Sequence, residues 1–405
     1  MIELLKIIII VIAILFLVKK KWDLGLVLFL GTLLTGLIFS LNLKVFSHNL
    51  LEALISRETI NVIGIILLVL YLGNLLRIKG NFKKMVNSLK KLVPEPRLIL
   101  ALPPAFIGLL PMIGGALMSA PIVEEAGRRW KLTPALKTFL NYWFRHIWEY
   151  CWPLYINLIF ASDILQIPIK RISYVQFPFT ILAVLLGLVV LFVRVPHLPK
   201  ERSDQSFLSN LFNLFFSIWP ILLAIILVFV FKFTLLFSLG VVVLLTQVFF
   251  RMNIQERFKI IWKSISVKTV FLLASVMMFK RILEVSGALS SLTRVFPPEG
   301  TSAYLLLFTV PFFLGLLTGV NHAYVGIAFP ILLPILGEGD PDMVLVMFAY
   351  VSGFVGILLS PTHFCLVLTL DYFKANLRDV YKILIWPSLI VFSAAFLVLL
   401  FLRII

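Results

Sequence analysis

Charged residues are scarce in this chain of 405 residues, because Asp, Glu, Lys and Arg together make up only 14% of it. Soluble domains contain about 25% charged residues, so this shortage, together with a hydrophobic content of 61%, excludes an ordinary soluble protein. Apolar runs of about 18–22 residues match the thickness of the hydrocarbon core of a bilayer. The runs are continuous rather than alternating, so they predict membrane-spanning helices instead of a transmembrane β-barrel. The lipid bilayer is therefore an expected partner.

Cysteine and the motifs of enzymes are also nearly missing. The two cysteines, Cys151 and Cys365, fall in predicted spans without the spacing of a metal-binding motif, and we expect them to be small buried side chains. The chain has no signature of a catalytic triad, of a phosphate-binding glycine loop or of a zinc-binding helix. We therefore expect a protein that is not an enzyme and that has no resident metal or cofactor.

Positive charge is more abundant than negative charge, with 36 Lys and Arg against 19 Asp and Glu. Most of these cations lie in short loops beside the spans, where the positive-inside rule places them, so nucleic acid is not an expected partner. The first apolar run is followed, not preceded, by positive charges at 19–21. This order predicts a first transmembrane helix with an outside N-terminus rather than a signal peptide.

The predicted elements occur in the same order in both halves of the chain. The segment FIGLLPMIGGA at 106–116 matches FLGLLTGVNHA at 313–323, and Pro153 matches Pro361. Such self-similarity indicates an internal repeat. The predicted units are a first repeat, a cytoplasmic linker and a second repeat: 1–194, 195–210 and 211–405.

Each repeat is predicted to hold five transmembrane helices, one of them broken, and one re-entrant helical hairpin. The hairpins are 98–126 and 304–336, and the broken helices are 136–161 and 344–370. Both hairpins are dense in Pro and Gly, which excludes one straight helix through either segment. Re-entry of the first hairpin keeps the basic loops on both its sides in the cytoplasm. Because each repeat then crosses the membrane an odd number of times, the repeats are predicted to be inverted.

The first broken helix carries an unusual polar cluster. Asn141, Arg145 and Glu149 are spaced to share one helical face, and His146 points away from it. A charge at bilayer mid-depth costs at least about 2.5–3.5 kcal/mol, so the cluster predicts a functional site, next to a helix break at 152–153. We expect Arg145 to bind an anion and Glu149 to bind a coupling ion or carry a proton. The alternative is a purely structural ion pair.

The remaining candidates for solute and ion binding lie at the two hairpin tips and at the second helix break: Gly114, Gly115 and Ser119; Thr318, Asn321 and His322; Ser360, Thr362 and His363. Glycine lets a ligand approach the backbone closely, and the ends of half-helices offer N–H groups to anions and carbonyl groups to cations. The alternative is that the glycines only allow close helix packing.

Three runs of sequence carry a resemblance to a known family: LPMIGGALMSAPIVEEA, NYWFRHIWEY–WPLY and LLSPTHFCLVLT–YFKANL. They resemble the prokaryotic integral membrane proteins catalogued as domain of unknown function 401, and the likeness covers essentially the whole chain. More remotely, the architecture is similar to the ion transporter superfamily of secondary transporters. That resemblance implies elevator-type alternating access, a homodimer and a place in the prokaryotic plasma (inner) membrane. The Ser-Asn-Thr tip signature of its dicarboxylate branch is missing here.

These observations together predict a secondary active transporter of a small anionic solute, coupled to Na⁺ or H⁺, with any Na⁺ near the hairpin tips. Two alternatives stay open. One is a cation/proton antiporter without an organic substrate, in which Glu149, His322 and His363 titrate. The other is a lipid-handling intramembrane protein.

Overall fold

The computed structural model describes most of the chain: residues 2–20, 22–93, 95–111, 115–198, 207–287, 297 and 300–404. Throughout these ranges the chain forms helices and no strands, which confirms the all-α prediction. Among the described residues, five helices are long and apolar enough to cross a membrane, or six if the bent pair α13 (Ile254–Ser264) and α14 (Val267–Val285) is one span. The chain is therefore a multi-pass helical membrane protein.

The elements of the first half are α1 (Ile2–Lys19), α2 (Leu24–Ile38), α3 (Leu43–Ile55), α4 (Arg57–Ile78), α5 (Asn81–Leu92), η1 (Pro96–Leu100), α6 (Leu102–Ile107), α7 (Gly115–Arg129), α8 (Pro134–His146), η2 (Ile147–Tyr150), α9 (Ile156–Ile164) and α10 (Ile169–Arg194). Those of the second half are α11 (Phe207–Phe229), α12 (Leu235–Phe249), α13, α14, α16 (Thr301–Thr318), α17 (Asn321–Leu336), α18 (Met343–Leu358), α19 (Phe364–Phe373) and α20 (Leu377–Ile404). Much of the predicted linker, 199–206, lies outside the described residues.

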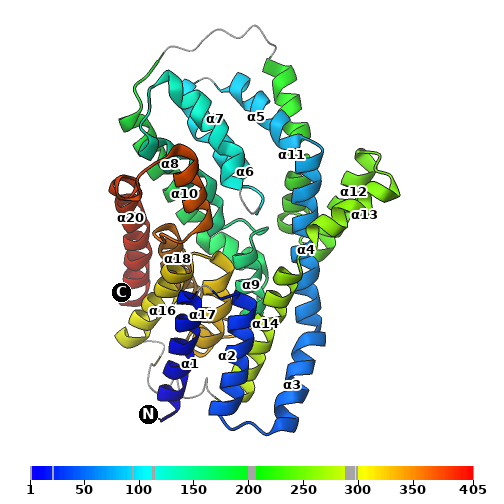
Figure 1. Cartoon of the computed structure of the whole chain (residues 1–405), viewed down its shortest axis with the longest axis vertical. Helices are drawn as coiled ribbons and strands as arrows, with labels where there is room; N and C mark the ends of the chain where they lie inside the picture. Colours follow the sequence, from blue (N-terminus) through cyan, green and yellow to red (C-terminus); the bar gives the residue numbers. More distant parts are fainter. Residues whose placement is uncertain are drawn as a thin grey trace.

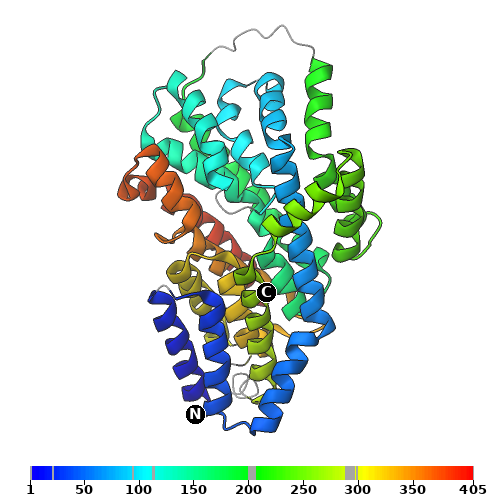
Figure 2. The same cartoon turned by 45° about the vertical axis from the view of Figure 1, so that its right-hand side comes forward.

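Two Pro- and Gly-rich helix pairs lie toward opposite ends of the molecule. The pair α6 and α7 lies near the upper end in Figure 1, and the pair α16 and α17 lies in the lower half. Figure 2 shows the same arrangement after a turn of the molecule, with α1 and α2 beside the lower pair. Helix α8 of the first interrupted pair packs against α6 and α7, and α18 of the second interrupted pair packs against α16 and α17.

The first interrupted helix ends earlier than the Pro153 signal indicates. Helix α8 stops at His146, a 3₁₀ turn follows, and α9 begins at Ile156. The carbonyl oxygen of Glu149, freed by this early end, accepts hydrogen bonds from the Tyr350 hydroxyl (2.7 Å) and from the Asn157 amide (3.4 Å). Side chains from distant parts of the chain therefore replace the missing helical bonds, as buried backbone groups require.

The second interrupted helix breaks between α18 and α19 as predicted from Pro361. The Ser360 hydroxyl donates to the Leu316 carbonyl at the end of α16 (2.7 Å). The Tyr381 hydroxyl donates to the carbonyl of Leu359 (2.8 Å). Both bonds satisfy polar groups at the break and fix it against neighbouring helices.

The segment 42–58, in which charged and apolar residues are interspersed, forms α3 and the start of α4. Helices α3 and α4 follow one another as a single apolar stretch of 36 residues. Ser56 separates them, and its hydroxyl caps α4 by accepting from the Thr59 amide (3.1 Å). Helix α3 packs against α14, and Arg281 of α14 binds Glu52 at 2.8 Å. These tertiary contacts explain why the amphipathic segment joins the helix bundle.

Candidate functional site

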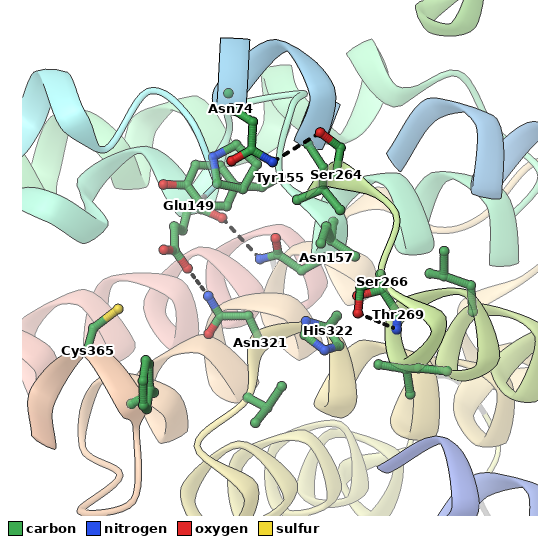
Figure 3. A pocket seen from close by; sticks show the side chains of 18 of the residues that line it. Asn74, Glu149, Tyr155, Asn157, Ser264, Ser266, Thr269, Asn321, His322 and Cys365 are labelled. Atoms are coloured by element: carbon green, nitrogen blue, oxygen red, sulfur yellow. Dashed lines mark hydrogen bonds between the residues drawn. The ribbon is translucent and has the colours of Figure 1, made fainter. Parts of the chain in front are cut away.

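A cavity of about 420 Å³ lies where the interrupted helices meet. We call it the central cavity. Its walls come from α4, the first helix pair, both helix breaks, the α13–α14 junction and the turn between α16 and α17. Figure 3 shows polar side chains pointing into this space from several of these elements. Residues 111 and 319–322, which belong to the two predicted hairpin tips, line this cavity.

Five of the predicted site residues line the central cavity: Arg145, Glu149, Asn321, His322 and His363. They come from α8, η2, the start of α17 and the second break. Residues separated by more than 200 positions in sequence therefore meet in one cavity.

Arg145 and Glu149 form the charged centre of the site. The guanidinium Nη1 lies 3.5 Å from the Glu149 carboxylate, and both side chains are only 3% exposed. Nη1 also donates to the Tyr155 hydroxyl at 2.6 Å, and that hydroxyl donates to the Gly108 carbonyl at 2.5 Å. Because removal of one partner would leave the other charge buried and unpaired, each charge depends on the other.

The Glu149 carboxylate is also the link between the two halves of the chain. The Asn321 amide at the start of α17 donates to it, as Figure 3 shows. The Asn157 amide donates to the Tyr350 hydroxyl at 2.6 Å, and Tyr350 in turn bonds the Glu149 carbonyl. One residue thus connects η2, α9, α17 and α18 by hydrogen bonds.

His146 and His363 contact one another across the two breaks. Their Nε2 atoms are 3.0 Å apart, and both rings are buried. His146 lies 3.8 Å from the Glu149 carboxylate. His146, predicted to point away from the Arg145 face, is the last residue of α8 and contacts a residue of the other half.

Gly115 contributes by the space it leaves. A Cβ atom there would lie 2.9 Å from Nε of Arg145 and 3.3 Å from Nη2. The absence of a side chain therefore makes room for the guanidinium, which is a packing role in direct support of the site. Gly114, its neighbour in the predicted tip, lies outside the described residues.

Among the described residues, the other predicted ones do not line the central cavity. The Asn141 amide donates to the Ala116 carbonyl at 3.0 Å and joins α8 to α7, whereas the Ser119 hydroxyl donates to the same carbonyl at 3.2 Å within α7. Thr318 bonds its own helix at the Leu314 carbonyl (2.7 Å). Ser360 and Thr362 bond each other at 3.0 Å, and Thr362 is exposed. These five side chains bond helix carbonyl groups or each other instead of lining the cavity.

Several lining residues are absent from the sequence-based prediction: Asn74, Arg77, Tyr155, Asn157, Lys263, Ser264 and Cys365. Asn74 donates to the Ser264 hydroxyl at 3.0 Å, which joins α4 to the end of α13. Tyr155 and Asn157 directly follow the Pro153 break, so the break itself was the available signal. Cys365, expected to be only a small buried side chain, is buried but reaches the cavity.

Comparison with known proteins supports the resemblance found in the sequence. A family model described as "Protein of unknown function (DUF401)" matches residues 2–405. No curated protein matches the chain. Because the family model covers almost every residue, the chain belongs to the DUF401 family.

Proposed function

We propose that this protein is a secondary active transporter that binds a small anionic solute in the central cavity and couples its movement to Na⁺ or H⁺. The observation that carries the proposal is the charge of the lining. Arg77, Arg145 and Lys263 line the cavity with Glu149 as the opposing carboxylate. Cationic walls attract anions, and a guanidinium matches the geometry of carboxylate or phosphate. The volume of about 420 Å³ suits a small molecule.

Inverted repeats are part of the proposal, and reciprocal helix contacts support them. Helix α17 packs against α9, and α7 packs against α19. Likewise α10 contacts α18 while α20 contacts α8, and α2 contacts α14 while α12 contacts α4. In each of these three cases a contact between the halves has a counterpart with the halves exchanged, as expected for two copies of one unit related by a two-fold axis.

The mouth of the cavity supports an inward-open state. Arg77 and Lys263 are exposed at its edge, and both belong to basic stretches that the positive-inside rule places in the cytoplasm. Alternating access would then move the helix pairs α6–α7 and α16–α17 against a scaffold of α1, α2, α4 and their second-half counterparts. This elevator-type movement is proposed from the architecture.

The test starts with thermal unfolding of the purified protein in detergent, with phosphate, sulfate, carboxylates and sugar acids added singly as sodium salts. A ligand of the native state at 100 times its Kd stabilises it by about 2.7 kcal/mol. We expect at least one of these anions to raise the Tm, with NaCl as the control. If none raises it, the anion proposal is wrong.

Arg145→Gln is expected to abolish this anion-dependent rise in Tm. Loss of one partner from a buried ion pair costs about 3–5 kcal/mol, so the double variant R145Q/E149Q, which removes both charges, serves as the folded comparison. Arg171→Gln is the matched control, because Arg171 pairs with Asp340 (3.1 Å) away from the cavity. A full response in R145Q/E149Q would contradict an anion site at Arg145.

A cation/proton antiporter remains the second candidate. The observation that favours it is the direct contact of buried protonatable groups, His146, His363 and Glu149, at the centre of the site. Proton exchange by proteoliposomes in the presence of Na⁺ or K⁺, without any organic anion, would support the antiporter over the solute transporter.

A further inference from the structure

The contact between His146 and His363 has an unusual pattern of hydrogen bonds. His146 is the last residue of α8, and His363 immediately precedes α19. Their Nε2 atoms face each other at 3.0 Å. The side chains are 1% and 6% exposed, so water contributes little to either ring.

The second ring nitrogen of each histidine fixes the position of one proton. Nδ1 of His146 lies 2.5 Å from the Tyr142 carbonyl, and Nδ1 of His363 lies 2.6 Å from the Gly319 carbonyl. A carbonyl oxygen only accepts hydrogen bonds, so both Nδ1 atoms must donate. A neutral imidazole carries one N–H and one lone pair. If both rings were neutral, two lone pairs would therefore face each other in a buried contact.

The orientation of the rings points to a proton between them. The ring centroids are 5.1 Å apart, which is close to the largest separation that a 3.0 Å contact between the Nε2 atoms permits. The two lone pairs therefore point along the line that joins them. A proton on this line converts the repulsive contact into an N–H···N hydrogen bond of ordinary length. A metal ion would need the lone pairs to converge on a point beside that line.

We propose that His146 and His363 share one proton and form a proton-binding site that joins the two helix breaks. One ring is then an imidazolium that donates from Nε2, and the other is a neutral imidazole that accepts. The role of this proton as the coupling ion rests on the proposed transport function. Binding of the proton by itself does not.

The charged and titratable groups around the pair come from every element packed against it: Tyr142 and Arg145 of α8, Glu149 of η2, Tyr155 after the first break, His322 of α17, Cys365 of α19 and Tyr381 of α20. Arg145 and Glu149 are 3.5 Å apart and offset each other's charge. The Glu149 carboxylate, 3.8 Å from Nε2 of His146, stabilises the shared proton.

The shared proton gives the centre of the site one net positive charge. An anion then binds more tightly to the protonated site, and by linkage the anion raises the proton affinity of the histidine pair. Such reciprocal coupling is the requirement for proton–anion symport, in which neither ligand crosses efficiently alone. The sequence analysis leaves Na⁺ and H⁺ as possible coupling ions, and we infer that the coupling ion is H⁺.

The histidine pair also connects α8, the start of α19 and the turn between α16 and α17. His363 holds the α16–α17 turn through the Gly319 carbonyl. Gly319 lies so close that a Cβ atom there would be 2.7 Å from the backbone nitrogen of His363. Loss of the proton restores lone-pair repulsion between α8 and α19. Proton release would thus loosen the contact between the breaks and the second tip.

The test is nitrogen NMR of the full protein with ¹⁵N-labelled histidine. The chain has five histidines, so single His→Gln variants assign each signal. We expect His146 and His363 to keep N–H on Nδ1 at all pH values and to titrate together with one proton per pair. Separate titrations, or an Nε2–H tautomer in a pair that carries no extra proton, would overturn the proposal.

Two variants separate the pair from the general titration of histidine. His363→Gln should remove the shared proton and shift the His146 signal, whereas His48→Gln, at an exposed position of α3, should leave the pair unchanged.

Cys365→Ser should leave the shared proton in place. A donor atom from each of His146, His363 and Cys365 lies within 4.8 Å of the others. Stoichiometric Zn²⁺ or Co²⁺ binding that is lost in C365S would show a metal site and overturn the proton assignment.

These NMR outcomes do not depend on transport. If no anion is transported but the pair still binds one proton, the proposed function fails and the proton site stands. If an anion is transported and the pair shows no shared proton, the proton site fails and the transport function stands.

Discussion

Gly115 sets the position of the Arg145 guanidinium, because a Cβ atom at this position would collide with the side chain at 2.9 Å. The guanidinium is otherwise held by Tyr155 at 2.6 Å and Glu149 at 3.5 Å. The site therefore depends on a residue that carries no chemistry of its own. Its contribution is the space that it leaves for a buried cation.

Gly115→Ala is expected to displace Arg145 and to lower the affinity for the anion by roughly tenfold, since each factor of ten is about 1.4 kcal/mol. The matched control is Gly240→Ala in α12, where an added Cβ meets nothing within 4 Å. That control should keep full affinity and gain up to about 1 kcal/mol of stability from the better helix propensity of Ala. Equal affinities in the two variants would refute the supporting role of Gly115.

At the scale of residues, the sequence identified the charged members of the site better than the neutral ones. Arg145 and Glu149 are conspicuous because a charge inside a span is costly. Asn74 and Asn157 carry no such signal, since an amide is uncharged and costs less to bury than a charge. Their roles appear only when Ser264 and Tyr350, distant in sequence, come into contact with them.

The interrupted helices are the elements on which the site depends. Pro153 and Pro361 mark both breaks in the sequence, yet α8 ends seven residues before Pro153 at His146. The helical periodicity of a sequence depends on residues within one segment. The early end of α8 is instead stabilised by hydrogen bonds from Tyr350 and Asn157, which lie outside α8. The existence of the break was therefore predictable, and its position was not.

Tyr350→Phe is expected to destabilise the protein by about 1–3 kcal/mol, because it leaves the buried Glu149 carbonyl without its shortest hydrogen bond. The control is Tyr372→Phe in α19, where the side chain is exposed and the change should stay within about 0.5 kcal/mol. Unfolding of both variants in detergent, followed by circular dichroism, measures the difference. A Tyr350→Phe variant as stable as the Tyr372→Phe variant would show that the break is stable without this bond.

At the scale of the whole molecule, the sequence predicted the helical membrane class, and the described chain confirms it. The long apolar runs carry that information directly. The inverted repeat and the number of crossings remain predictions, supported by reciprocal contacts such as α17 with α9 and α7 with α19. The central cavity could not be predicted, because it is formed by segments from both halves whose meeting depends on tertiary packing.

Large apolar side chains are exposed on the outer helices, as expected if the protein is surrounded by a lipid bilayer. Val193 on α10 is 76% exposed, and Leu397 on α20 is 62% exposed. In contrast, Arg145, Glu149 and the histidine pair are buried. The molecule thus has an apolar outside and a charged centre, which is the arrangement expected of a carrier for a polar solute.

Simultaneous measurement of anion and proton movement tests the central claim most directly. The full protein is reconstituted into vesicles with a pH indicator inside, and the anion found by thermal unfolding is added outside. We expect the anion gradient to acidify the vesicle interior with the wild-type protein. Proton movement should be lost with His363→Gln and retained with His48→Gln. Anion uptake by the wild-type protein without acidification, or acidification that survives in the His363→Gln variant, would contradict the account.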